Sequence, residues 1–168
     1  MHGEERMDCF EQLYEQYATD VLRVCYFYLG DRQRAEDVCQ DVFVKLLTTK
    51  PHLEQGKEKA WLFKVALNRC RDLWRGAWLK RVTLGDDAFA TIPAPDDAEQ
   101  KEQEKQLVEA IHSLAPDFRD VILLFYYQNF QISEISAILH LPEGTISSRL
   151  SRARDKLKRI LEKSERGS

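Results

Sequence analysis

The chain has 168 residues, of which 43% are hydrophobic and 32% are charged, and its formal net charge at pH 7 is −3. This length allows one domain or two small ones, and the hydrophobic content is sufficient for packed cores. No run of about 18 apolar residues is present, so no membrane span is predicted. The N-terminal residues also lack the apolar stretch of a signal peptide, and we therefore expect a cytoplasmic protein.

Apolar residues at helical spacing predict an all-α chain. The first helix carries an apolar stripe over residues 10–28 and ends at Gly30. A second helix begins near Gln33 and is stopped by Pro51, and a third spans roughly residues 59–78. No segment alternates apolar and polar residues for long enough to predict a sheet.

Residues 82–100 interrupt this pattern with one glycine, two prolines, four aspartates and few large apolar residues. Such a composition is typical of a flexible or extended linker. Helical spacing resumes at about Ala98. We therefore predict two small helical domains, residues 5–81 and 101–165, joined by a flexible linker over residues 82–100.

The last quarter of the chain has the pattern of a helix-turn-helix. Residues 132–140 predict a short helix, residues 141–144 a turn, and residues 145–157 the start of a long helix. The long helix has one apolar stripe, formed by Ile146, Leu150, Ala153, Leu157 and Ile160.

Polar and basic side chains lie away from that stripe, at Ser148, Arg149, Arg152 and Lys156. A helix anchored on one side and carrying serine and arginine on the other is suited to reading the major groove of DNA. Charge alone is also typical of a solvated face on an ordinary surface helix. The short helix, the turn and the basic cluster together favour DNA contact.

The net charge conceals two basic blocks. Residues 57–81 have a charge balance of +6 and residues 143–168 one of +4, whereas residues 1–56 and 82–104 have balances of −5 and −6. Phosphate binding depends on the local density of Lys and Arg, so the acidic average does not exclude a nucleic-acid partner. The first basic block also contains tryptophans and a phenylalanine, which suit either single-stranded bases or a helical core.

The four cysteines, Cys9, Cys25, Cys39 and Cys70, contain no C-x-x-C pair, and the four histidines do not gather near them. Metal sites need clustered ligands. We therefore interpret the thiols as small buried apolar groups and expect no metal and no cofactor.

Three segments, in this order, resemble motifs of the extracytoplasmic-function (ECF) group of bacterial RNA polymerase sigma factors. Residues 35–43 (AEDVCQDVF) are similar to the helix of that family that binds core polymerase. Residues 60–72 (AWLFKVALNRCRD) resemble its strand-opening helix, and residues 141–154 (LPEGTISSRLSRAR) resemble its −35 recognition helix. The match covers nearly the whole chain outside the linker and the two ends.

The resemblance implies three sets of site residues. The residues expected to dock on the coiled-coil clamp of the largest polymerase subunit are Asp37, Gln40, Asp41 and Phe43. Those expected at the melted −10 element are Asn68, Trp61, Arg69, Arg71, Arg75 and Lys57. Those expected at the −35 element are Thr145, Ser147, Ser148, Arg149 and Arg152.

In the family, the residue aligned with Asn68 helps to hold a base that is flipped out of the −10 element, and the loop over residues 52–59 sets which base is accepted. Extruding a base costs a few kcal/mol of lost stacking, which a preformed pocket offsets. The implied partners are core RNA polymerase, through its clamp and flap, promoter DNA, and an anti-sigma factor, which in many members is membrane-bound. No small-molecule substrate is implied.

Two other classes of function predict different features. A stand-alone helix-turn-helix regulator would have an apolar effector pocket and would bind an operator tightly by itself. An enzyme has little support, because the sequence lacks a nucleophile motif, a His-Glu-x-x-His pair and a glycine-rich phosphate loop.

Overall fold

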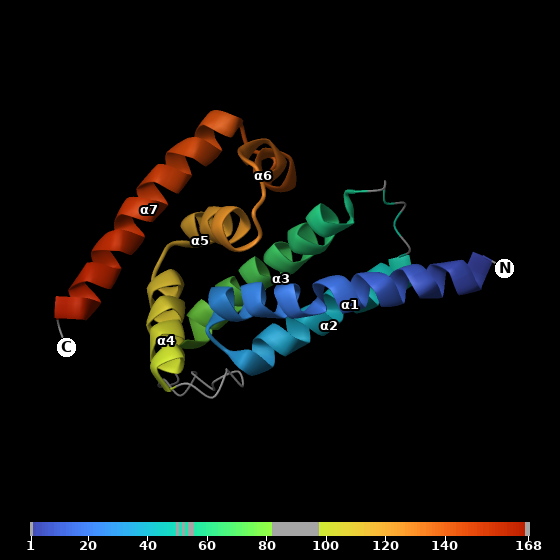
Figure 1. Cartoon of the computed structure of the whole chain (residues 1–168), viewed down its shortest axis with the longest axis horizontal. Helices are drawn as coiled ribbons and strands as arrows, with labels where there is room; N and C mark the ends of the chain where they lie inside the picture. Colours follow the sequence, from blue (N-terminus) through green and yellow to red (C-terminus); the bar gives the residue numbers. More distant parts are fainter. Residues whose placement is uncertain (1, 50, 52, 54–55, 82–97, 167–168) are drawn as a thin grey trace.

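The described part of the chain contains helices and no strands, as the periodicity predicted. The computed structural model describes residues 2–49, 51, 53, 56–81 and 98–166. Its elements are α1 (His2–Leu29), α2 (Arg32–Thr49), α3 (Glu58–Arg81), α4 (Ala98–His112), α5 (Pro116–Ile122), the π-helical turn η1 (Leu123–Tyr127), α6 (Ile132–Leu139) and α7 (Glu143–Arg166). They form two groups, α1–α3 and α4–α7 (Figure 1). None of these helices has an apolar stretch long enough to cross a lipid bilayer.

The junction between α1 and α2 lies where the sequence predicted it. Gly30 has a φ of 70°, which glycine adopts without steric cost, and α1 ends at the residue before it. Asp31 then caps α2, because its Oδ1 accepts hydrogen bonds from the backbone N–H groups of Gln33 at 2.9 Å and Arg34 at 3.3 Å. The chain therefore reverses within two residues, and α1 and α2 lie side by side (Figure 1).

Buried side chains of α1, α2 and α3 form the core of the N-terminal group. Residues of this core that are no more than 1% exposed are Val21, Val24, Cys25, Tyr28, Ala35, Val38, Val42, Leu62, Phe63, Ala66 and Cys70. Fully burying a large apolar side chain contributes about 1.5–3 kcal/mol, so this core holds the three helices in fixed register. The register decides which residues of α2 and α3 remain on the surface.

The cysteines behave as predicted at two positions. Cys25 and Cys70 are fully buried, and Cys39 is partly buried with its thiol 3.5 Å from the carbonyl oxygen of Ala18. The prediction was wrong for Cys9, which is exposed because it lies outside the apolar stripe of α1.

The helix-turn-helix forms between α6 and α7. His140 ends α6 in the left-handed region with a φ of 56°, and the side chain of Glu134 accepts a hydrogen bond from the backbone N–H of Gln131 at the start of α6. Helix α7 begins at Glu143, two residues before its predicted start, because the carbonyl oxygen of Pro142 already accepts the first helical bond from Ile146 at 3.1 Å.

The π-helical turn η1 was not predicted. In it, the N–H of Gln128 donates to the carbonyl oxygen of Leu123, five residues earlier, at 3.2 Å. The turn ends before Asn129, whose positive φ of 57° agrees with the turn expected there. It places Phe130 toward the N-terminal group.

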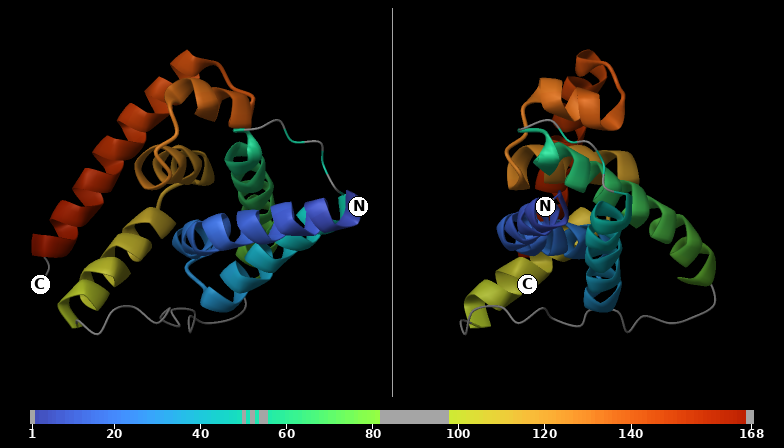
Figure 2. Two further views of the ribbon diagram at one scale, coloured as in Figure 1. Left: turned by 45° about the vertical axis from the view of Figure 1, so that its right-hand side comes forward. Right: turned by 90° about the vertical axis from the view of Figure 1, so that its right-hand side faces the viewer.

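The two groups of helices pack against each other, which the sequence did not predict. α1 lies against α4 and η1, and α3 lies against α6 (Figure 2). The rings of Phe27 and Tyr127 are 4.8 Å apart between centroids, and those of Phe63 and Phe130 meet edge to face at 5.9 Å. Residues 82–97 of the predicted linker lie outside the described residues, and residues 98–100 form the start of α4.

Arg119 on α5 is a buried cation at the contact between the groups, with an exposed fraction of 1%. Its guanidinium lies 3.8 Å from the ring centroid of Trp74 on α3, and Nη1 donates to the carbonyl oxygen of Tyr28 on α1 at 3.1 Å. Nε donates to the carbonyl oxygen of Leu114 at 2.8 Å, and Nη2 to that of His112. One side chain thus joins α4, α5, α1 and α3.

Candidate nucleic-acid interface

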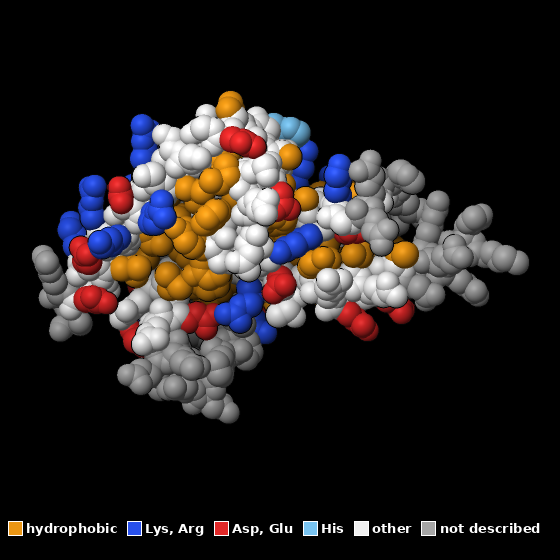
Figure 3. Space-filling view, turned by 45° about the horizontal axis from the view of Figure 1, so that its top comes forward, with side chains coloured by type: hydrophobic (Ala, Val, Ile, Leu, Met, Phe, Trp, Pro, Cys, Tyr) orange, Lys and Arg blue, Asp and Glu red, His pale blue; other side chains and the backbone are white. Residues whose placement is uncertain are grey.

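The long helix α7 carries the residues that the sequence assigned to the −35 element. Its opposite face is anchored, because Ile146, Leu150 and Ala153 are at most 5% exposed. Of the five assigned residues, the exposed ones are Ser147, Ser148 and Arg152, and the partly buried ones are Thr145 and Arg149. Lys and Arg side chains gather along the edge of the molecule where α7 runs (Figure 3). This arrangement has the exposed polar row that groove reading requires.

Arg149 does not simply extend into solvent. Its Nη1 lies 3.7 Å from Oδ1 of Asp117, and the arginine side chain is 26% exposed. Asp117 belongs to the first turn of α5, where a carboxylate also interacts favourably with the helix dipole. The charge of this residue, which the sequence assigned to the −35 element, is therefore partly neutralised in this arrangement.

The residues assigned to the −10 element lie along α3 and just before it. Most are exposed, namely Lys57, Asn68, Arg69 and Arg75, whereas Trp61 and Arg71 are partly buried. Trp61 packs against the hydrophobic core. Its helical spacing had allowed either this role or a contact to single-stranded bases. In the loop over residues 52–59, positions 52, 54 and 55 lie outside the described residues, and Lys59 donates to the carbonyl oxygen of Gln128 at 2.6 Å.

Arg69 forms an ion pair with Asp41, at 3.3 Å between Nε and Oδ2. Arg69 was predicted to contact the −10 element and Asp41 to contact core polymerase. The two predicted binding surfaces therefore adjoin at this ion pair. Both side chains are about half exposed, at 49% and 55%. A pair of this kind contributes about 0.2–1 kcal/mol, so polymerase or DNA can separate it at small cost.

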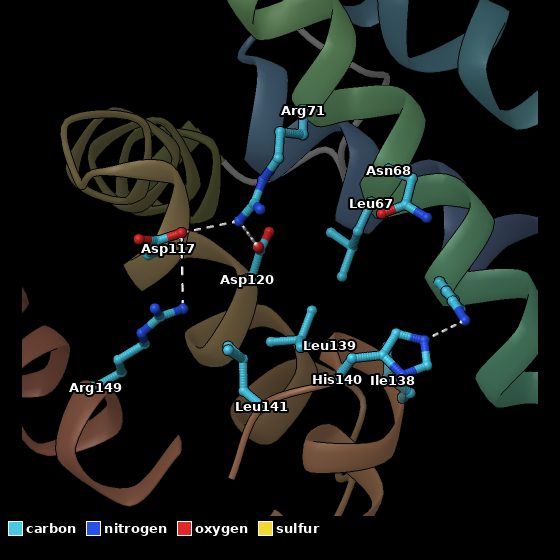
Figure 4. A pocket seen from close by; sticks show the side chains of 11 residues that line it. Leu67, Asn68, Arg71, Asp117, Asp120, Ile138, Leu139, His140, Leu141 and Arg149 are labelled. Atoms are coloured by element: carbon cyan, nitrogen blue, oxygen red, sulfur yellow. Dashed lines mark hydrogen bonds and ion pairs between the residues drawn. The ribbon is translucent and has the colours of Figure 1, made fainter. Parts of the chain in front are cut away.

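Arg71 lies at the centre of a charged cluster between α3 and α5. Its Nη2 donates to Oδ1 of Asp117 at 3.0 Å and to Oδ2 of Asp120 (Figure 4). The side chain of Asp120 is only 3% exposed. Its burial raises the pKa of Asp120 from its ordinary value of 3.8 to about 7, and Arg71 opposes this effect. The sequence did not indicate either aspartate as a partner of the DNA-binding residues.

A cleft of about 210 Å³ separates α3 from α5, α6 and the start of α7. The residues around it are Lys64, Leu67, Asn68, Arg71, Asp117, Asp120, Ile138, Leu139, His140, Leu141 and Arg149 (Figure 4). Lys64 and His140 lie across the cleft from each other, with 2.7 Å between Nζ and Nε2. Asn68, assigned to the −10 element, and Arg149, assigned to the −35 element, therefore face one small cavity. Nothing in the local pattern of α3 predicted this proximity.

A second surface lies along α1 and α2. Of the residues assigned to core polymerase, Asp37, Gln40 and Asp41 are exposed, whereas Phe43 is 3% exposed. Phe43 lines a groove of about 420 Å³, whose other residues are Phe10, Tyr14, Leu22, Glu36, Cys39, Gln40, Val44 and Leu47. Sequence reasoning missed Tyr14, Val44 and Leu47, which are 43–50% exposed. Tyr14 and Leu47 belong to the apolar spacing of their helices, which by itself indicated burial.

The raised pKa of Asp120 predicts a specific pH dependence of stability. The folded chain binds this proton more tightly than the unfolded chain, so the contribution of Asp120 to the unfolding free energy is largest below about pH 4 and falls until about pH 7. Asp120→Asn removes this titration, while the charged groups that face it, Arg71, Asp117, Arg119 and Arg149, remain. Between pH 5 and pH 8 this contribution falls by about 3 kcal/mol, and we expect the melting temperature of the wild type, measured relative to the variant, to fall by about 5–10 °C.

Circular dichroism melts of the two proteins at matched pH values make this comparison. Parallel curves for the wild type and the variant would show that Asp120 titrates normally in the folded chain.

Two family models match the chain, Sigma-70 region 2 over residues 13–80 and Sigma-70 region 4 over residues 104–157. The chain is 31% identical over 145 residues to "ECF RNA polymerase sigma factor SigL" of Mycobacterium tuberculosis (strain ATCC 25618 / H37Rv), which covers 82% of this chain and 80% of SigL. It is 29% identical over 153 residues to "ECF RNA polymerase sigma factor SigM" of Bacillus subtilis (strain 168), which covers 89% and 93%. It spans 63% of the length of SigE of Mycolicibacterium smegmatis, at 28% identity.

Solved structures have the same arrangement of helices. The sigma factor RpoE, in its complex with the anti-sigma factor NepR from Bartonella quintana, matches with a TM-score of 0.77 and 25% identity, over 91% of this chain and 96% of RpoE. CnrH, in complex with the cytosolic domain of CnrY, matches with a TM-score of 0.72 and 22% identity, over 93% and 89%. Both matches extend over the N-terminal and the C-terminal helices.

Proposed function

The chain belongs to the ECF RNA polymerase sigma factors, and we propose that its two groups of helices hold separate parts of one promoter while the chain is bound to core polymerase. As a sigma factor it directs promoter-specific initiation of transcription. The proposal assigns particular residues of this chain to each of these contacts. It also includes a cytoplasmic location and the absence of enzymatic activity.

The observation that carries the proposal is the geometry of α7. Its apolar face is buried against α4, α5 and α6, and Ser147, Ser148 and Arg152 are exposed on the other side. An α-helix anchored in this way fits the major groove, where serine and arginine contact base edges and phosphates. We therefore assign Ser147, Ser148, Arg149 and Arg152 to the −35 element.

The N-terminal helices supply the other two contacts. Asn68 and Arg69 are exposed on α3 and suit a melted −10 strand, where an amide can pair with a base edge and a guanidinium with a phosphate. The acidic and apolar surface of α2, with Asp37, Gln40 and Asp41 beside the groove at Phe43, suits docking on the coiled-coil clamp of the largest polymerase subunit. Charge complementarity at such a surface steers association.

An anti-sigma factor is the proposed regulatory partner. The support is that RpoE of Bartonella quintana was solved with the anti-sigma factor NepR, and CnrH with the cytosolic domain of CnrY. A stand-alone regulator with an apolar effector pocket finds no support in the cleft between the two groups, because charged and amide side chains make up much of its lining.

The deciding experiment is runoff transcription from ECF-type promoters with purified core polymerase, with and without this chain. We expect promoter-specific transcripts only when both are present, and feeble promoter binding by the chain alone. Unchanged initiation on every promoter tried, together with a tight shift of some operator by the chain alone, would establish the stand-alone regulator instead.

Arg149→Ala is expected to reduce −35-dependent initiation about tenfold, since one good arginine contact to a base contributes about 1–3 kcal/mol of discrimination. Core association should remain unchanged, because Arg149 pairs with Asp117 on α5 and is not among the residues of the groove on α1 and α2. Lys163→Ala, at the exposed end of α7, is the matched control. Equal loss of promoter use and core binding in Arg149→Ala would contradict the assignment.

A further inference from the structure

The cleft between α3 and the C-terminal helices is lined by more positive than negative charge. Its charged side chains are three cations and two carboxylates, which leave a balance of +1, namely Lys64, Arg71, Arg149, Asp117 and Asp120. His140 also lines the cleft, and an imidazole that takes up a proton adds a further positive charge. The balance is therefore positive in either state of His140.

The arginines and the carboxylates neutralise one another on the α5 side of the cleft. Asp117 lies 3.0 Å from Arg71 and 3.7 Å from Arg149, and Asp120 is a second partner of Arg71. His140 lies on the opposite side of the cleft from Asp117 (Figure 4). The excess positive charge therefore belongs to the side where α3 meets the end of α6.

Lys64 of α3 and His140 at the end of α6 form an unusual pair, because both side chains are basic. Their Nζ and Nε2 atoms are 2.7 Å apart, so the ammonium donates to the unprotonated nitrogen of a neutral imidazole. Within the described residues neither side chain forms an ion pair with a carboxylate. The amide of Asn68, one turn further along α3, lines the same cleft. These three side chains can all donate to an anion.

The space suits a small anion. The cleft has a volume of about 210 Å³, which at about 30 Å³ per water molecule corresponds to roughly seven waters. This is room for a tetrahedral anion with a few waters. Asn68 and His140 are exposed, so the cleft opens to solvent beside them. The apolar part of the lining offers no side-chain hydrogen bonds and is formed by Leu67, Ile138, Leu139 and Leu141.

We propose that this cleft binds a small phosphate-type dianion, which Lys64, Asn68 and His140 hold between α3 and the end of α6. The ligand is free phosphate or pyrophosphate, or the terminal phosphoryl group of a nucleotide. Its binding takes up a proton at His140, because an imidazolium donates to the anion whereas the neutral ring accepts from Lys64. The site goes beyond the proposed function and does not depend on the assigned DNA contacts.

Isothermal titration calorimetry of the full-length chain with inorganic phosphate, pyrophosphate and ADP, at fixed ionic strength, tests the site. We expect saturable binding at one site per chain. Lys64→Gln and His140→Asn should each weaken it about tenfold, as expected for the loss of one charged hydrogen bond. Asparagine is the chosen replacement because it tolerates the left-handed φ of 56° at position 140.

Arg159→Gln is the matched control, because it removes one exposed positive charge from α7 outside the cleft. It should leave the affinity unchanged, and circular dichroism verifies that each variant is folded. Equal weakening in Arg159→Gln would show diffuse attraction to basic surface and would overturn the site. Absence of saturable binding for all three probes, or wild-type affinity in folded Lys64→Gln and His140→Asn, would do the same.

The order of affinities among the three probes identifies the source of the anion. Tighter binding of ADP than of phosphate and pyrophosphate would show that the site takes the phosphoryl group of a nucleotide. The reverse order would show that it takes a free anion, since the nucleoside then adds no favourable contact.

Proton uptake gives a second signature, which a purely structural role of these side chains would not produce. Sulfate is the probe, because its charge does not change between pH 6 and pH 8, the range in which histidine gains a proton. Burial raises the pKa of Asp120 to about 7, so this side chain also loses its negative charge as the pH falls. The groups that face Asp120 are Tyr28, Arg71, Asp117, Arg119 and Arg149.

We expect sulfate to bind the wild type about tenfold more tightly at pH 6 than at pH 8. In His140→Asn the difference should shrink to the part that Asp120 supplies. In the double variant His140→Asn, Asp120→Asn it should vanish. A wild-type affinity for sulfate that is the same at both pH values would contradict an anion held by His140.

Discussion

Replacing Arg119 with methionine is expected to lower the free energy of unfolding by about 3–5 kcal/mol. The guanidinium is 1% exposed and donates to the carbonyl oxygens of Tyr28, Leu114 and His112. Methionine fills a similar volume but leaves these buried acceptors without their partner, and each unsatisfied acceptor costs about 1–3 kcal/mol. It also removes the cation from the face of Trp74.

Urea unfolding followed by circular dichroism measures this loss. Arg119→Lys is the matched variant, because it keeps the charge but cannot bond to three carbonyl oxygens in the directions that the guanidinium uses. We expect it to recover less than half of the stability. A loss below about 1 kcal/mol for Arg119→Met would mean that water satisfies these carbonyl groups and that Arg119 does not join the two groups of helices.

Asp41→Arg is expected to weaken binding to core polymerase by about 1.5–3 kcal/mol, which is roughly ten- to hundredfold in affinity. The carboxylate is exposed on α2 beside the groove at Phe43, and a reversed charge there opposes a partner surface of complementary sign. The ion pair with Arg69 is also lost, but both side chains are about half exposed, so the chain itself should lose less than about 1 kcal/mol of stability.

Fluorescence anisotropy of labelled chain titrated with core polymerase, without DNA, measures this affinity. Asp72→Arg makes the same charge change at an exposed position of α3 and should leave core affinity unchanged. Wild-type affinity in Asp41→Arg would place the docking surface elsewhere, and Tyr14, Val44 and Leu47 at the groove would be the next residues to substitute.

Helix positions and faces were predictable because they depend on neighbours within a few residues. The apolar stripe of α7, the stop at Gly30 and the break between α6 and α7 at Pro142 all follow from spacing and from local turn chemistry. The exposed residues of the recognition helix could be named for the same reason. The family of the chain was also predictable, because three motifs occur in one order.

Partners across the molecule were not predictable from these patterns. Asp117 and Asp120 are separated from Arg71 by 46 and 49 residues, and nothing in the spacing of α5 distinguishes them from other helix-surface acids. Arg119 was equally unpredictable. Nothing in its neighbouring residues distinguishes it from a surface arginine, yet it is buried between Trp74 and three carbonyl oxygens.

The sequence by itself thus determined that the described elements are helices and that α3 and α7 carry rows of polar side chains. Tertiary packing alone decided that Arg71 and Arg149 share one carboxylate and that Asp120 titrates near neutrality. The physical reason is range: helical periodicity arises from contacts one turn apart, whereas ion pairing and desolvation depend on which distant surfaces come together.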